Sequence, residues 1–193
     1  MKWHELIIDS LGRVYGLLEK ALDGLTPEDL NKQPWPHCNT IGWLTWHLTR
    51  WQDRSIALFM GEEQLWISDR WCEKFDRKPD PEDTGLGHTS EDVVAFKSPD
   101  VEILLGYYNA VLDRTGRYLA SLTATELDRQ LNDRWYGSEL WFESKRWHQG
   151  KSRHQGLPSL GVRLVSMAND NIQHAGQVAY LRGMLKGKGW YGA

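Results

Sequence analysis

The chain has little cysteine, because Cys38 and Cys72 are the only two among its 193 residues. Two cysteines exclude a framework of several disulfides, and their separation in the sequence excludes a CxxC zinc knuckle. Neither cysteine lies in a motif that activates a thiol. We therefore interpret both as packing residues and not as a nucleophile or a redox pair.

Long apolar runs and an excess of one charge are also lacking. No stretch approaches the ~18 apolar residues that a membrane helix needs, so no membrane partner is predicted. An acid at Glu5 stands where a signal peptide would place its apolar segment, which predicts a cytoplasmic protein. The 23 Lys and Arg against 26 Asp and Glu give a net charge of −3, which argues against a nucleic-acid partner. We interpret the basic run at residues 145–154 as a solvated loop.

Strand signals are scarce, since β-branched runs are few and no Asn-Gly or Asp-Gly turn separates alternating segments. Apolar residues instead recur with the helical period in four stretches. These run from Trp3 to Leu22, from Thr40 to Gly61, from Ser98 to Leu122 and from Leu160 to Gly187. Ser98, followed by proline, is the predicted cap of the third helix.

The length suits one core, so a single domain over residues 1–193 is predicted. Its expected fold class is all-α, a four-helix bundle with two long connections packed over one end. These connections are residues 62–97 and 129–158, and their length and aromatic content are typical of lids or binding loops.

Tryptophan is abundant, with 11 residues. Trp43, Trp46 and Trp51 belong to the second predicted helix, on a face that is more often core or dimer interface than pocket. Bundles with exposed aromatic edges frequently associate, and a homodimer is therefore predicted.

The fourth predicted helix interrupts its apolar stripe with polar residues. Asn171 and His174 occupy stripe positions, and Asp170 lies one turn before His174. Gln177 lies on the flank of the same face. A buried polar group without a partner costs on the order of 1–3 kcal/mol, so this cluster requires partners. His47, on the interior side of the second predicted helix, is one candidate.

Two interpretations of this cluster are open. Asp and His at i, i+4 meet on one helical turn, and His47 would complete a three-ligand metal site with open positions for water or substrate. Alternatively, Asp170 accepts a hydrogen bond from His47 or His174, and Asn171 and Gln177 close a buried polar network.

Several segments resemble the DinB-like superfamily of four-helix bundles. The second predicted helix carries the similarity at Thr40–Leu48, and the fourth carries it at Asn169–Gln177 and Tyr180–Gly183. Gly85–Phe96 is similar to the connector of some bacterial branches. Together with the first and third predicted helices, the resemblance covers most of the chain.

The resemblance implies one divalent metal ion, usually zinc or nickel, held by one histidine of the second helix and two of the fourth. His47 and His174 match two of these positions, and the third falls on Asp170. A carboxylate there shifts the preference toward harder ions, which makes iron or manganese the alternatives.

Characterised relatives include transferases and isomerases that use low-molecular-weight thiols such as mycothiol or bacillithiol. The resemblance thus implies a thiol-dependent S-transferase or isomerase acting on a small-molecule electrophile, since a metal-bound thiol is ionised. Gln177 is the candidate that orients a ligand or water, and Arg50 the candidate that meets an anionic substrate group. Arg50 is equally interpreted as a solvated surface residue. The alternative function is a non-catalytic small-ligand-binding protein of the stress response that uses the same cavity.

Overall fold

The computed structural model describes residues 2–131 and 159–187. Within these ranges every regular element is a helix, which confirms the predicted all-α fold. In chain order the elements are α1 (Trp3–Leu22), α2 (Pro27–Asn31), α3 (Ile41–Met60), α4 (Leu65–Ser68), α5 (Trp71–Lys74), α6 (Ser90–Ala95), α7 (Val101–Ser121), η1 (Ala124–Asp128) and α9 (Leu160–Lys186).

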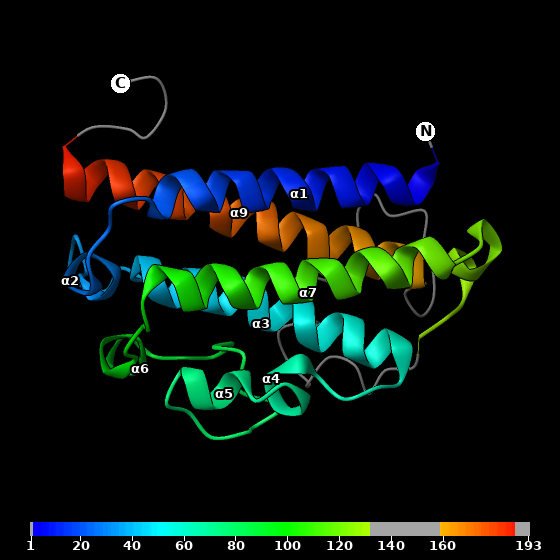
Figure 1. The fold of residues 1–193 in the computed structure, drawn as a ribbon, viewed down its shortest axis with the longest axis horizontal. Coiled ribbons are helices and arrows are strands. Elements are labelled where there is room, and N and C mark those ends of the chain that lie inside the picture. The colour runs from blue at the N-terminus through cyan, green and yellow to red at the C-terminus, as the bar shows by residue number, and fades with distance from the viewer. Residues whose placement is uncertain (1, 132–158, 188–193) are drawn as a thin grey trace, which may run out of the picture. The chain divides into compact units, whose positions relative to one another are not determined.

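The chain divides into two compact units, Met1–Ser121 with Met167–Ala193, and Leu122–Ser166. In the first unit, α1, α3, α7 and the C-terminal part of α9 lie side by side (Figure 1). The second unit holds η1 and the start of α9, where the Leu160 amide donates to the Arg129 carbonyl at 2.9 Å. The single-domain organisation of residues 1–193 stays a prediction.

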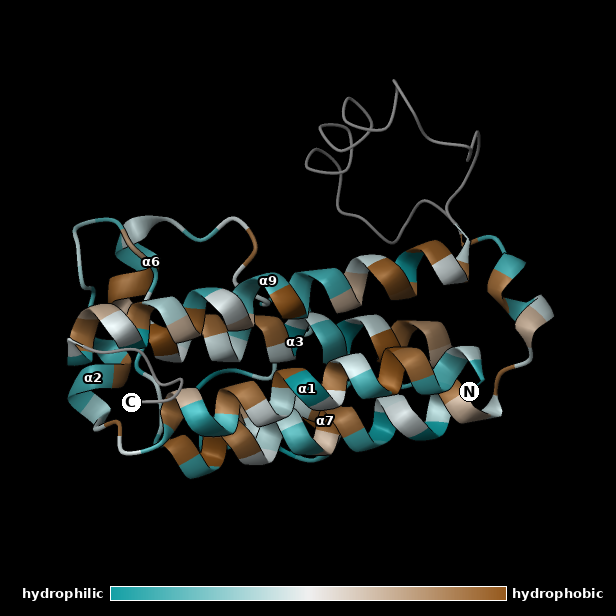
Figure 2. Ribbon diagram, turned by 90° about the horizontal axis from the view of Figure 1, so that it is seen from above, coloured by the Kyte–Doolittle hydropathy of each residue, from teal (hydrophilic) through white to brown (hydrophobic). Residues whose placement is uncertain are grey.

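One hydrophobic core joins the long helices of the first unit. Hydrophobic and hydrophilic residues alternate along each long helix (Figure 2). The helical period gathers the apolar ones on one face, so that Leu18, Leu44, Tyr108 and Val178, one from each helix, meet in this core. No helix in the described ranges combines the length and the hydropathy that crossing a membrane requires.

The connection between α3 and α7 packs on the bundle through aromatic rings. Trp66 and Phe75 lie 5.7 and 5.8 Å from Tyr107 of α7, measured between ring centroids. Phe96 lies 4.9 Å from Trp46 of α3. The predicted packing of residues 62–97 onto the bundle is thus confirmed. Most of the second predicted connection, including its basic run, lies outside the described residues.

Helix caps fix where α3 and α7 begin. The Thr40 hydroxyl accepts a hydrogen bond from the Trp43 amide at 3.2 Å, as a cap should. The predicted cap of the third long helix, Ser98, is wrong. Asp100 takes this role, because its carboxylate accepts from the amide of Ile103, three residues on, at 2.9 Å.

A buried carboxylate ties the connection to α3. Asp53 is fully buried in α3, and its oxygens accept hydrogen bonds at 2.7–3.0 Å from the Leu65 and Trp66 amides and the Tyr107 hydroxyl. Arg50 and Arg114 each bring a nitrogen within 3.7 Å of the same carboxylate. The two amides begin α4, where amide groups lack helical partners, so Asp53 satisfies them and fixes the position of α4.

Candidate metal centre

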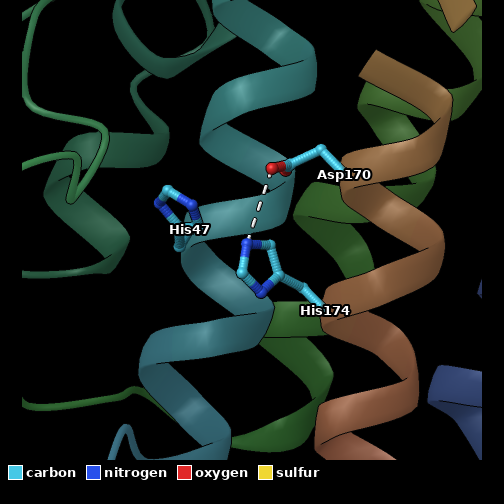
Figure 3. Close-up of side chains that lie close together, drawn as sticks. All are labelled: His47, Asp170 and His174. Carbon is cyan, nitrogen blue, oxygen red and sulfur yellow. Dashed lines mark ion pairs between the residues drawn. The ribbon is translucent and has the colours of Figure 1, made fainter. Parts of the chain in front are cut away.

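The three residues predicted as ligands come together in the first unit. His47 lies on α3, and Asp170 and His174 lie one turn apart on α9, all directed toward one point (Figure 3). One ligand atom from each residue lies within 4.8 Å of the other two. The imidazole rings of His47 and His174 are 4.9 Å apart and nearly perpendicular. Such a His-Asp-His cluster has the composition and spacing that can hold a metal ion.

The orientation of the His47 ring is fixed from outside the cluster. Its Nδ1 forms a hydrogen bond with the backbone carbonyl of Thr84, and the ring stacks on Trp43 with an interplanar angle of 8°. A carbonyl oxygen only accepts, so Nδ1 carries the proton and donates it. The Nε2 lone pair of His47 is therefore free to bind a ligand.

His174 is held in the same way by its own helix. Its Nδ1 lies 2.8 Å from the Gln177 side-chain oxygen, one turn further along α9. Since that oxygen only accepts, Nδ1 again carries the proton, and Nε2 is left on the side of Asp170. Gln177, predicted to orient a ligand or a water, thus contacts His174 directly.

The pKa values of the two histidines are shifted in opposite directions. Burial lowers the pKa of His47 below its ordinary value, against the opposite effects of the Thr84 carbonyl and the Asp170 charge. Burial also lowers the pKa of His174, but hydrogen bonding and charge from Asp170, together with Gln177, outweigh it and raise this pKa. At neutral pH His47 is consequently a neutral imidazole, the form that binds metal.

The carboxylate of Asp170 is only partly satisfied by the protein. Its Oδ1 lies 3.5 Å from His174 Nε2, whereas Oδ2 is buried without a hydrogen-bond partner among the described residues. An unsatisfied buried oxygen is costly, and a cation between the three residues would remove that cost. The side chains of Asp170 and His174 are 28% and 20% exposed, so the cluster lies near the protein surface.

The alternative of a closed polar network forms only in part, because Asp170 and Gln177 both contact His174 whereas Asn171 and His47 do not join them. Asn171 is fully buried, and its amide nitrogen donates back to the Met167 carbonyl at 3.1 Å. Its side-chain oxygen has no hydrogen-bond partner within the described ranges. His47 directs its N–H to Thr84 and not to Asp170. The donor set therefore fits a cation better than a self-contained network.

A sequence model of the DinB superfamily matches residues 10–178. The chain belongs to the DinB superfamily. A comparison of this DinB protein with curated proteins gave no match.

A solved structure from Enterococcus faecalis has the same fold as this DinB protein. It is described as a conserved protein, with a TM-score of 0.79 and 28% sequence identity. The similarity covers 97% of this chain and 99% of that one. It supports the fold over the whole chain and adds no substrate or reaction.

Arg50, predicted from the sequence as either a substrate contact or a solvated surface residue, does not lie at the surface, and its contact with a substrate stays a prediction. Its side chain is fully buried, and its guanidinium donates to carbonyl groups of Asp80, Pro81 and Asp83 and to Gln64. The surface interpretation is wrong because acceptors from a distant segment enclose the charge. Sequence periodicity contained no signal for that segment.

The segment before α6, part of the connection predicted as a lid or binding loop, lies against His47. Gly85 has a φ of +85°, and a Cβ there would lie 3.1 Å from His47 Nδ1. His88 accepts a hydrogen bond from the Trp43 indole at 3.1 Å and thereby fixes the ring that stacks on His47. The glycine doublet at Gly85 and Gly87 was the one available signal of close backbone approach.

Proposed function

We propose that this DinB protein is a divalent-metal-dependent enzyme in which His47, Asp170 and His174 hold one ion. One observation carries the proposal: both histidines direct Nδ1 at an oxygen, so that Nε2 of His47 is free and Nε2 of His174 faces Asp170, whose other carboxylate oxygen is unsatisfied. Metal-ligating histidines in proteins almost always donate their other ring N–H in this way.

The donor set favours particular ions. Two imidazoles suit zinc or nickel, and the carboxylate adds affinity for iron or manganese. When bound, the ion would supply the Lewis acidity that lowers the pKa of a coordinated thiol or water. The negative charge of Asp170 offsets part of the ion's charge, and Thr84 and Gln177 keep the two imidazole rings oriented.

The reaction class that we propose is S-transfer or isomerisation of a small electrophile by a low-molecular-weight thiol. Membership in the superfamily supports this class, and so does the position of Asp170 and His174 near the protein surface. The thiol would give up its proton, and its sulfur would form the new bond to the electrophilic carbon as the leaving group departs from that carbon with the electron pair of the broken bond.

Elemental analysis of untagged protein, purified without chelator, tests the metal proposal. We expect about one ion per chain in the wild type, and its loss in His47→Ala and Asp170→Ala. His4→Ala, on α1, is the matched control and should keep the ion. Absence of metal in the wild type, even after incubation with zinc, nickel, manganese or iron, would refute the proposal. A thiol-transfer screen with the identified ion follows.

A second candidate is a non-catalytic binding protein for a small ligand, in a stress response. The observation that favours it is the carboxylate of Asp170 at a position where the superfamily pattern has a histidine. This candidate predicts that small thiols or electrophiles raise the melting temperature without turnover. We also propose a cytoplasmic homodimer, and light scattering in solution tests the oligomeric state.

A further inference from the structure

Arg50 binds one short segment of backbone through several of its N–H groups at once. Its Nε lies 3.0 Å from the Asp83 carbonyl, and one terminal nitrogen lies 3.2 and 3.3 Å from the Asp80 and Pro81 carbonyls. The other terminal nitrogen donates to the Gln64 side chain at 2.7 Å. The planar guanidinium thus holds residues 80–83 in one conformation.

The next residue in that segment is the one that orients His47. The carbonyl of Thr84 accepts the His47 Nδ1–H, and Asp83, directly before it, is bound by Arg50. Arg50 lies three residues after His47 on α3, so the ring and the guanidinium project from adjacent turns of one helix. α3 therefore carries both His47 and Arg50, the residue that fixes the carbonyl to which His47 donates.

We infer that Arg50 is a positioning residue for His47, which acts by fixing the carbonyl of Thr84 and thereby the Nδ1–H tautomer and ring orientation of His47. The inference rests on the proposed function in one respect only, namely that the free Nε2 of His47 binds a divalent ion. The orientation itself is a property of the protein without metal.

The environment of Arg50 explains why an arginine can act there. Its charge is offset by Asp53 at 3.7 Å and lies 4.6 Å from the centroid of the Trp66 ring. Gln64 also donates to the Pro81 carbonyl at 3.1 Å, so it supports the same segment from a second side. A lysine would keep the charge near Asp53 but lacks the flat fork that reaches several carbonyl groups.

Arg50→Lys is the test, with Arg54→Lys as its matched control. Arg54 lies one turn further along α3 and contacts the same segment through the exposed Glu82 side chain and not through backbone carbonyls. Proteins labelled with ¹⁵N-histidine report the ring tautomer by NMR, and His47→Gln assigns the His47 signals. Zinc affinity is measured on the same samples by calorimetry.

We expect wild type and Arg54→Lys to show His47 as the Nδ1–H tautomer alone. Arg50→Lys should show both tautomers and bind zinc roughly tenfold more weakly, with an unchanged helical circular-dichroism spectrum. A folded Arg50→Lys protein that keeps the wild-type tautomer and zinc affinity would overturn the inference, because it would give Arg50 a merely structural role.

The test remains decisive if Arg50→Lys does not fold or if the wild type binds no metal. If Arg50→Lys does not fold, Gln64→Met replaces it. This variant removes a hydrogen-bond partner of Arg50 and the hydrogen bond to the Pro81 carbonyl, and it keeps Arg50 next to the Asp53 carboxylate. The His47 tautomer and the zinc affinity are then measured as before. If the wild type binds none of zinc, nickel, manganese and iron, the proposed function fails, and the tautomer of His47 in the variants alone supports or overturns the role of Arg50.

Discussion

Gly85→Ala is expected to disturb the candidate metal centre through a contact with three rings. A Cβ at this position would lie 2.8 Å from Trp43, 2.9 Å from Trp46 and 3.1 Å from His47 Nδ1. Gly87 offers a matched control, because its φ of +83° is nearly that of Gly85 at +85°. A Cβ at Gly87 would meet no described atom within 4 Å.

The difference between the two alanine variants isolates the steric effect. The left-handed backbone costs an alanine ~1–2 kcal/mol at either position. Overpacking adds about 1–3 kcal/mol at Gly85 alone. Loss of freedom in the unfolded chain is the same for both variants and cancels. Since 1 kcal/mol shifts the melting temperature of a chain this long by roughly 2–4 °C, Gly85→Ala should melt about 2–12 °C below Gly87→Ala.

Urea unfolding followed by circular dichroism measures the free energies of unfolding, and calorimetry measures zinc binding. We expect Gly85→Ala to weaken zinc binding, since its Cβ moves the ring of His47, and Gly87→Ala to leave it unchanged. Equal free energies of unfolding for the two variants, or normal zinc affinity in Gly85→Ala, would refute the view that this close approach sets the position of His47.

Three further predictions concern other groups. Asp53→Ala leaves Arg50 and Arg114 without their buried carboxylate and should lower the free energy of unfolding by about 3–5 kcal/mol in urea titrations. A change within about 0.5 kcal/mol, as at an ordinary surface site, would contradict this. Zinc affinity should increase with pH, because the ion displaces the proton of His174. The raised pKa of His174 extends that increase above pH ~6.5, and a flat calorimetric profile there would argue against this ligand. Gln177→Leu removes the acceptor of His174 Nδ1–H and should weaken zinc binding roughly tenfold, whereas the exposed Gln173→Leu should not.

Much of the cluster could be predicted because it depends on one helix. Asp170 and His174 are four residues apart, and the α-helical period places them on the same face whatever the rest of the chain does. The apolar stripe of the second predicted helix likewise placed His47 on the interior side, and it is buried there. Cap selection was less reliable. Ser98 and Asp100 are both good capping residues. Which of them caps α7 depends on where the first amide groups of the helix without helical partners lie.

The surroundings of the cluster could not be predicted in the same way. Thr84 reaches His47 across 37 residues of sequence, and the carbonyl groups that bind Arg50 belong to irregular backbone. A backbone carbonyl is present at every residue, so no side-chain pattern marks the one that accepts a hydrogen bond. Arg50 is buried because the connection between α3 and α7 folds over it. The residues next to Arg50 on α3 gave no indication of this burial.

Local periodicity and short-range spacing encode the long helices, the faces that they bury and the proximity of Asp170 to His174, so these features follow from the sequence. The folded structure shows which ring nitrogen of His47 carries the proton, which oxygen of Asp170 lacks a partner and which segment packs against His47. The features of His47 depend on its hydrogen bond with Thr84, 37 residues further along the chain, and this bond exists only after the connection has packed against α3.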